Sequence, residues 1–161
     1  MDQLIAGLDE QFARIDGRSR ALLSLIPAEH LYLPPRTANV AAAYPVYSCG
    51  EHLLRSAAAV EQTFGGITTN LWDDPFEWTL PESLATPELV LEYLAEVEAT
   101  RRRGFESFAD DGDLSKEIMT PSGESLKLFS LLLETLARAS HHQGRAFAVF
   151  SLFNDARLPH L

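Results

Sequence analysis

The sequence contains a single cysteine, Cys49, among 161 residues. One thiol cannot form a disulfide within the chain, and a zinc site made of four cysteines is excluded. No stretch approaches the roughly 18 consecutive apolar residues of a membrane-spanning helix. The first twelve residues include acids and lack an unbroken apolar run, so we expect no signal peptide there. From these absences we expect a soluble, cytoplasmic protein.

Basic residues are also few. Lysine and arginine total 13 against 23 aspartates and glutamates, which gives a formal net charge of −10. Nucleic acid and anionic membranes require a basic surface, so we expect neither as a partner. The chain is 46% hydrophobic and 22% charged, a balance typical of globular proteins, and it shows no internal repeat or low-complexity tract. Its length predicts a single domain over residues 1–161.

Apolar residues recur at helical spacing in four segments, and no segment shows convincing strand alternation. We expect helices over residues 3–26, 48–64, 86–109 and 122–153. Two connections, 28–47 and 65–85, run to about twenty residues, which is longer than the usual link between antiparallel neighbours. The pattern predicts an all-α fold, a four-helix bundle with long crossover or end-covering connections.

Local signals mark where two of these helices begin. Ser48 and Glu51 have the spacing of a capping box, in which each side chain binds the other residue's backbone amide. Thr86 precedes Pro87, and threonine followed by proline is typical of a helix start. The glycine pair 65–66 is expected to end the second helix.

Two cationic pairs interrupt apolar helix faces. Arg138 and His142 lie four residues apart in the last helix, on a stripe that is otherwise largely apolar. His52 and Arg55 lie beside an apolar stripe of the second helix. Side chains three or four residues apart share a helix face. We expect these four residues to meet across the bundle as a binding pocket for a small anion, because guanidinium forks suit carboxylate or phosphate.

An alternative interpretation places no ligand there. The arginines would then be held by acidic side chains, with Glu61, Glu92 and Glu134 as candidates. His141 is adjacent to His142 but diverges from it by about 100° around the helix, so the two should not bind one ion together. Cys49 lies at a helix start, where thiolates are favoured, but it lacks the histidine and acid of a nucleophilic set.

Two stretches resemble the DinB/YfiT-like family of metalloenzymes. The stretch YSCGEHLLR (47–55) is similar to the family pattern W-S-x-x-E-x-L-x-H, and RASHHQGRAFAVFSLFNDARLP (138–159) is similar to H-x-x-x-H-R-G-Q followed by an apolar run and a proline. The resemblance implies a four-helix bundle, commonly a homodimer, in which three histidines bind a divalent metal, usually zinc or nickel. Some relatives are thiol S-transferases that use low-molecular-weight thiols.

The resemblance places the three family histidines at Arg55, Arg138 and His142. A guanidinium has no free lone pair and stays charged, so it cannot be a metal ligand. Two of three ligands are therefore replaced, and we expect no bound metal or other cofactor. His52 lies one turn from Arg55 and could act as a shifted ligand.

Three interpretations remain open. The first is a metal-free protein whose cationic pocket binds a small anion or is closed by salt bridges, with an unknown specific activity. The second is a zinc- or nickel-dependent thiol S-transferase or hydrolase-like enzyme that uses His142 with His52. The third is a structural or regulatory homodimer with a vestigial site. The resemblance and the strongly apolar last helix both favour a homodimer.

Overall fold

The computed structural model describes residues 3–35, 46–75 and 81–159. Its main elements are four α-helices, and short 3₁₀ turns, η1 (Ala28–His30) and η3 (Asp111–Ser115), lie between them. The helices are α1 (Gln3–Leu23), α2 (Cys49–Thr69), α3 (Pro87–Glu106) and α4 (Leu128–Phe150). The expectation of a mostly helical, all-α chain is confirmed. None of the described helices combines the length and the hydrophobicity needed to cross a membrane.

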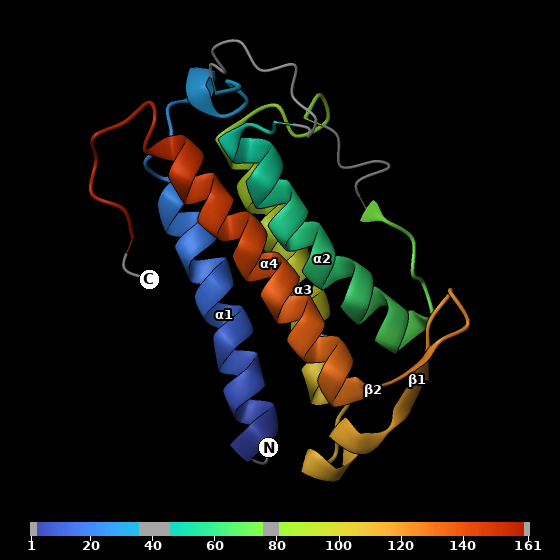
Figure 1. Ribbon diagram of the computed structural model, residues 1–161. Helices are drawn as coiled ribbons and strands as arrows, with labels where there is room; N and C mark the ends of the chain where they lie inside the picture. Colours follow the sequence, from blue (N-terminus) through green and yellow to red (C-terminus); the bar gives the residue numbers. More distant parts are fainter. Residues whose placement is uncertain (1–2, 36–45, 76–80, 160–161) are drawn as a thin grey trace.

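The four helices pack side by side (Figure 1). α1 and α4 run in one direction, and α2 and α3 run in the other. α2 contacts α3 and α4, and α1 contacts the same two helices. Because α2 and α3 run the same way, the chain has to connect the end of α2 to the opposite end of the bundle, where α3 begins, which explains the length of the connection.

A short antiparallel hairpin precedes α4, in a part of the chain where the sequence shows no convincing strand alternation. It consists of β1 (Glu117–Met119) and β2 (Ser125–Lys127), with Ile118 opposite Leu126. Gly123 closes the turn at φ 82° and donates its N–H to the Thr120 carbonyl at 2.9 Å. Three-residue strands are too short to show a recognisable alternation in the sequence. The hairpin also moves the start of α4 from the expected residue 122 to Leu128.

α2 continues past its glycine pair, contrary to the expectation that it ends there. It runs to Thr69, and Asn70 ends it in the left-handed conformation, with φ 56°. A glycine inside a helix costs about 1 kcal/mol relative to alanine. At Gly66 the missing side chain has a packing role, because a Cβ there would lie 2.4 Å from the indole of Trp72. α1 and α3 each end three residues earlier than expected.

Three phenylalanine rings form the centre of the core. Phe64 of α2 lies edge-on to Phe12 of α1, with ring centroids 5.5 Å apart, and 5.1 Å from Phe105 of α3. Gly104 permits this approach, since a Cβ on it would lie 2.3 Å from the Phe64 ring. The rings thereby join three helices at one point.

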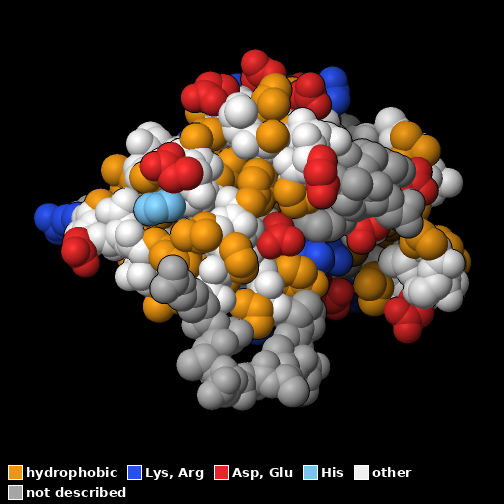
Figure 2. All heavy atoms as spheres, turned by 90° about the horizontal axis from the view of Figure 1, so that it is seen from above, with side chains coloured by type: hydrophobic (Ala, Val, Ile, Leu, Met, Phe, Trp, Pro, Cys, Tyr) orange, Lys and Arg blue, Asp and Glu red, His pale blue; other side chains and the backbone are white. Residues whose placement is uncertain are grey.

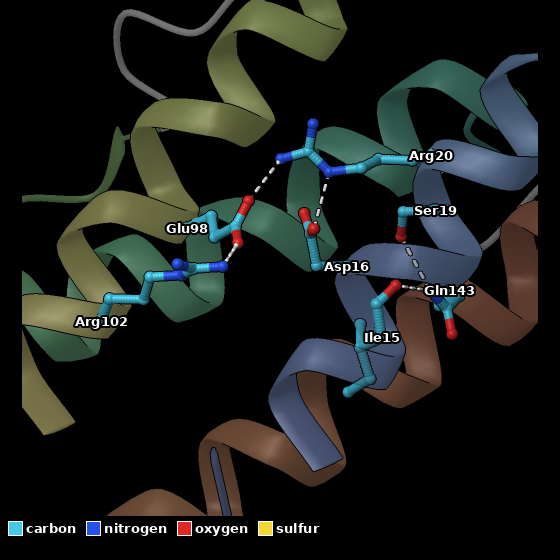
Figure 3. Close-up of polar contacts among 7 residues, drawn as sticks. All are labelled: Ile15, Asp16, Ser19, Arg20, Glu98, Arg102 and Gln143. Carbon is cyan, nitrogen blue, oxygen red and sulfur yellow. Dashed lines mark hydrogen bonds and ion pairs between the residues drawn. The ribbon is translucent and has the colours of Figure 1, made fainter. Parts of the chain in front are cut away.

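Polar side chains join α1 to α3 and α4 (Figure 3). Arg20 binds Asp16 at 2.6 Å and Glu98 at 3.2 Å, and Glu98 also binds Arg102. Burial raises the pKa of the Asp16 carboxyl above its ordinary value, although the hydrogen bond from Arg20 lowers it in part. These contacts fix α1 against α3.

Candidate cationic pocket

The helices that carry the predicted site residues, α2 and α4, are antiparallel and lie close together. Ser56 donates to the Ala139 carbonyl at 2.9 Å, and the hydroxyls of Thr63 and Thr135 are 2.7 Å apart. Small side chains along α2, among them the buried Ala58 and Ala59, allow the close approach. The register that results sets which side chains of the two helices meet.

Three of the four predicted residues line one hollow of about 100 Å³. They are Arg55, Arg138 and His142, which come from both helices. The other lining residues are Ala58, Ala59, Gln62 and Asp74. The sequence analysis did not consider Asp74, which follows α2 in an acidic pair, Asp73–Asp74, and this pair is the signal that could have found it.

Arg55 is half-buried and stacks on an aromatic ring. The carbon at the centre of its guanidinium lies 3.9 Å from the ring centroid of Tyr47, the residue before the Ser48 cap. A cation over an aromatic face is attracted by the negative face of the ring. This contact orients the guanidinium without neutralising its charge.

Arg138 is exposed and reaches across to α2. Its Nη2 donates to the Gln62 Oε1 at 3.2 Å and, at 3.4 Å, to the Ala59 carbonyl. Both acceptors are neutral. Of the acids expected as partners, Glu61 instead accepts a hydrogen bond from the Tyr93 hydroxyl at 2.6 Å, and burial raises the pKa of its carboxyl.

His52 and His142 form a pair next to the hollow. Their Nδ1 atoms are 3.3 Å apart, and His52 is only 4% exposed whereas His142 is half-buried. Burial is the largest cause that lowers the pKa of each histidine to about 4. The next causes are the charges of Arg145 and Arg55 for His52, and its partner histidine for His142. At neutral pH both rings are therefore uncharged, and one Nδ1–H can donate to the other Nδ1.

Two other residues considered from the sequence lie outside this pocket. His141 is exposed, as expected for a solvated residue, and its ring centroid is 5.6 Å from that of His142. Cys49 is buried, and its thiol lies 3.3 Å from the Ala146 carbonyl. Burial raises the pKa of this thiol to about 12. A thiol that remains protonated and enclosed is a poor nucleophile.

Over residues 3–35, 46–75 and 81–159, no group of three or more His, Cys, Asp or Glu residues is placed to hold a metal ion. The pair His52 and His142 supplies two nitrogens, whereas a catalytic zinc site usually has three protein ligands. The positions that the sequence resemblance assigns to the other ligands are the guanidiniums of Arg55 and Arg138.

The structure thus defines a mostly helical protein with a cationic hollow between two antiparallel helices. On the end of the molecule where α2 begins, Figure 2 shows Asp and Glu side chains around apolar groups, with few cations. Comparison of the chain with protein-family models, with curated proteins and with solved structures finds no match.

Proposed function

We propose that this chain is a metal-free, DinB-like four-helix-bundle protein whose pocket between α2 and α4 binds a small anion. The observation that carries the proposal is that Arg55 and Arg138, from different helices, line the same hollow with His142. Guanidinium groups bind carboxylate and phosphate oxygens through charge-assisted hydrogen bonds.

The charges around the hollow suit a monoanion. Arg55 stacks on Tyr47, and Arg138 donates to the neutral Gln62 side chain and Ala59 carbonyl, so both guanidiniums belong to the lining. Asp74 brings one carboxylate to the lining. Two guanidiniums and one carboxylate leave one net positive charge, which a carboxylate ligand would balance.

The lowered pKa values of the histidine pair also indicate that the pocket favours a negative charge. Cationic neighbours, Arg55 and Arg145, contribute to the lowered pKa values of His52 and His142. A field that opposes protonation of a histidine favours a bound negative charge. Binding of an anion should therefore raise the pKa of His142.

The test is calorimetric titration with acetate and with inorganic phosphate at constant ionic strength. We expect saturable binding to the wild-type protein, at least tenfold weaker in the Arg138→Gln variant. Arg14→Gln is the matched control, since Arg14 is an exposed helix arginine on α1 that pairs with Glu10. Equal binding by Arg138→Gln and Arg14→Gln, or an absence of saturable binding, would refute the proposal.

A second candidate rests on the separation of the two histidine nitrogens. At zinc–nitrogen distances of about 2.0–2.1 Å, two ligands of a tetrahedral zinc lie about 3.3–3.4 Å apart. The Nδ1 atoms of His52 and His142 are 3.3 Å apart, so the pair has a suitable spacing for zinc or nickel. The chain would then be a divalent-metal-dependent thiol S-transferase or hydrolase-like enzyme. The nearby guanidiniums oppose a cation electrostatically, which places this candidate second.

Metal analysis of protein purified without chelator separates the two candidates. We expect no stoichiometric zinc, nickel or iron. Metal close to one equivalent per chain that is lost in the His142→Ala variant would support the enzyme.

A homodimer is compatible with either candidate, and we propose one that forms through the exposed face of α4. This helix leaves Phe129 38% and Leu133 42% exposed.

A further inference from the structure

A second hollow of about 190 Å³ lies beside the cationic one. Its lining residues come from α2, from the segment after α2 and from α4. They are Gln62, Thr63, Trp72, Leu131, Glu134, Thr135 and Arg138. A cavity of about 150 Å³ is large enough to take a benzene molecule, so this hollow has room for a six-membered ring.

The two hollows adjoin along the groove between α2 and α4. Gln62 and Arg138 line both of them, and the hydrogen bond between these two side chains lies at the junction. A molecule whose anionic group contacts Arg138 from the first hollow can therefore extend into the second without leaving the groove.

The second hollow has an aromatic wall that is held in place. The indole of Trp72 packs on the bare backbone of Gly66 and donates from Nε1 to the Asn70 Oδ1 at 3.1 Å. The Trp72 carbonyl accepts from Gln62 Nε2 at 3.0 Å. A ring fixed in this way presents a flat apolar surface, and a flat partner could stack on it or meet it edge-on.

Other groups of this hollow favour an uncharged ligand part. The hydroxyls of Thr63 and Thr135 bind each other, and Thr135 also donates to the Leu131 carbonyl at 2.8 Å. Both hydroxyls are thus already hydrogen-bonded within the protein. The carboxylate of Glu134 would repel a second negative charge. The first hollow therefore suits an anionic group, whereas the second suits an uncharged ring that contacts Trp72 and Leu131.

We propose that the ligand of this groove is a monoanion with a flat apolar body, such as an arylalkyl carboxylate. Its carboxylate contacts Arg55 and Arg138 in the first hollow, and its ring lies against Trp72 and Leu131 in the second. This inference rests on the proposed anion site and extends it from a charge to a class of ligand.

Calorimetric titration with three probes tests the inference: propionate, 3-phenylpropionate and the uncharged 3-phenylpropanamide. We expect 3-phenylpropionate to bind at least tenfold more tightly than either of the others. Propionate measures the anion site alone, and the amide measures the ring site alone.

Gly66→Ala is the decisive variant, because its Cβ would collide with the Trp72 indole at 2.4 Å and displace it. We expect this change to reduce 3-phenylpropionate affinity to the level of propionate and to leave propionate binding unchanged. Gly17→Ala is the matched control, since a Cβ there meets nothing within 4 Å. If Gly66→Ala does not fold, Trp72→Leu takes its place. This change also removes the aromatic wall, so we expect the same effect on binding.

The outcomes separate the two proposals. Equal affinity for propionate and 3-phenylpropionate overturns the ligand class but leaves the anion site intact. Equal affinity for 3-phenylpropionate and its amide shows a ring site without a role for the arginines, which overturns the inference. Absence of binding by both acids refutes the anion site itself.

Discussion

The Nδ1 atoms of His52 and His142 lie 3.3 Å apart, across the interface between α2 and α4. Two imidazoles at this distance can share one proton as a hydrogen bond, but they cannot both be charged without repelling each other. The pair therefore links the packing of these two helices to the protonation state of their histidines.

Acid should weaken the fold through this pair. The pKa of each histidine is about 4 in the folded protein and about 6.5 when unfolded, so the unfolded chain binds protons first as the pH falls. The stability contributed by the neutral pair is complete above pH 6.5 and decreases as the pH falls from 6.5 to 4. Because His142 is partly exposed and the two histidines are coupled, we expect a loss of about 2 kcal/mol rather than two full shifts.

Urea denaturation between pH 7.5 and 4.5 measures this loss. The charged or titratable neighbours of the pair are Arg55, Arg145, His141 and Glu51. They remain in a His142→Gln variant, which should have a shallower pH dependence than the wild-type protein. His141→Gln, an exposed change on the same helix, should keep the wild-type dependence. The prediction fails if all three proteins lose stability in parallel.

Introducing two histidines should create a metal site. In the double variant Arg55→His and Arg138→His, three imidazoles would surround the hollow that His142 already lines. The change also removes two positive charges that oppose a divalent cation. We expect zinc or nickel to bind the double variant and to raise its melting temperature, because metal stabilises the folded state that it binds.

Thermal melts with and without zinc or nickel test whether metal raises the melting temperature. They are recorded for the wild-type protein, both single variants and the double variant. Each single variant should respond much less than the double variant. Adding His142→Ala to the double variant should abolish the response. A folded double variant that does not respond to metal would show that these three side chains do not converge.

Gln143 should contribute measurably to stability. Its buried side-chain amide donates to the Ile15 carbonyl at 2.6 Å and to the Ser19 hydroxyl at 2.7 Å, which joins α4 to α1 (Figure 3). Gln143→Ala removes both hydrogen bonds and leaves a cavity, at a cost of about 2 kcal/mol. Denaturant titration against Gln11→Ala, an exposed glutamine on α1, measures the difference. A cost within 0.5 kcal/mol of the control, roughly that of a surface change, would contradict the prediction.

The proposed homodimer can be tested on the exposed face of α4. Ala137 lies on this face, between the exposed Leu133 and Ser140. A charge buried at a self-associating surface is costly, so Ala137→Arg should convert the dimer to a monomer. Ala99→Arg, at an exposed alanine on α3, should remain dimeric. Light scattering at tens of micromolar distinguishes the two states, and a monomeric wild-type protein would exclude the dimer.

The starts of α2 and α3 could be predicted from the sequence because capping is local. The Ser48 hydroxyl accepts from the Glu51 N–H and the Glu51 carboxylate accepts from the Ser48 N–H, as the spacing indicates. The Thr86 hydroxyl accepts from the Leu89 N–H. The end of α2 could not be predicted, since Trp72 packing on Gly66 offsets the helix-breaking tendency of that glycine.

The candidate site could be predicted only in part. Helical spacing placed Arg138 near His142, and the structure brings Arg55 to the same hollow. The direct contact between His52 and His142 depends on the register of two antiparallel helices, which spacing within one helix does not specify. The second hollow depends on where the chain after α2 lies, and Trp72 gave no local signal of its position.

The start of α1 is bonded to a residue far along the chain. The Asp111 carboxylate accepts hydrogen bonds from the backbone N–H groups of Leu4 and Ile5, at 3.1 and 3.0 Å. Asp111 follows Leu4 by 107 residues in the sequence, so during synthesis α1 is made long before this acceptor exists. The hydrogen bonds that cap the first turn of α1 can therefore form only after α2 and α3 have been synthesised. Until then, the first helix to be made lacks these two acceptors at its N-terminus.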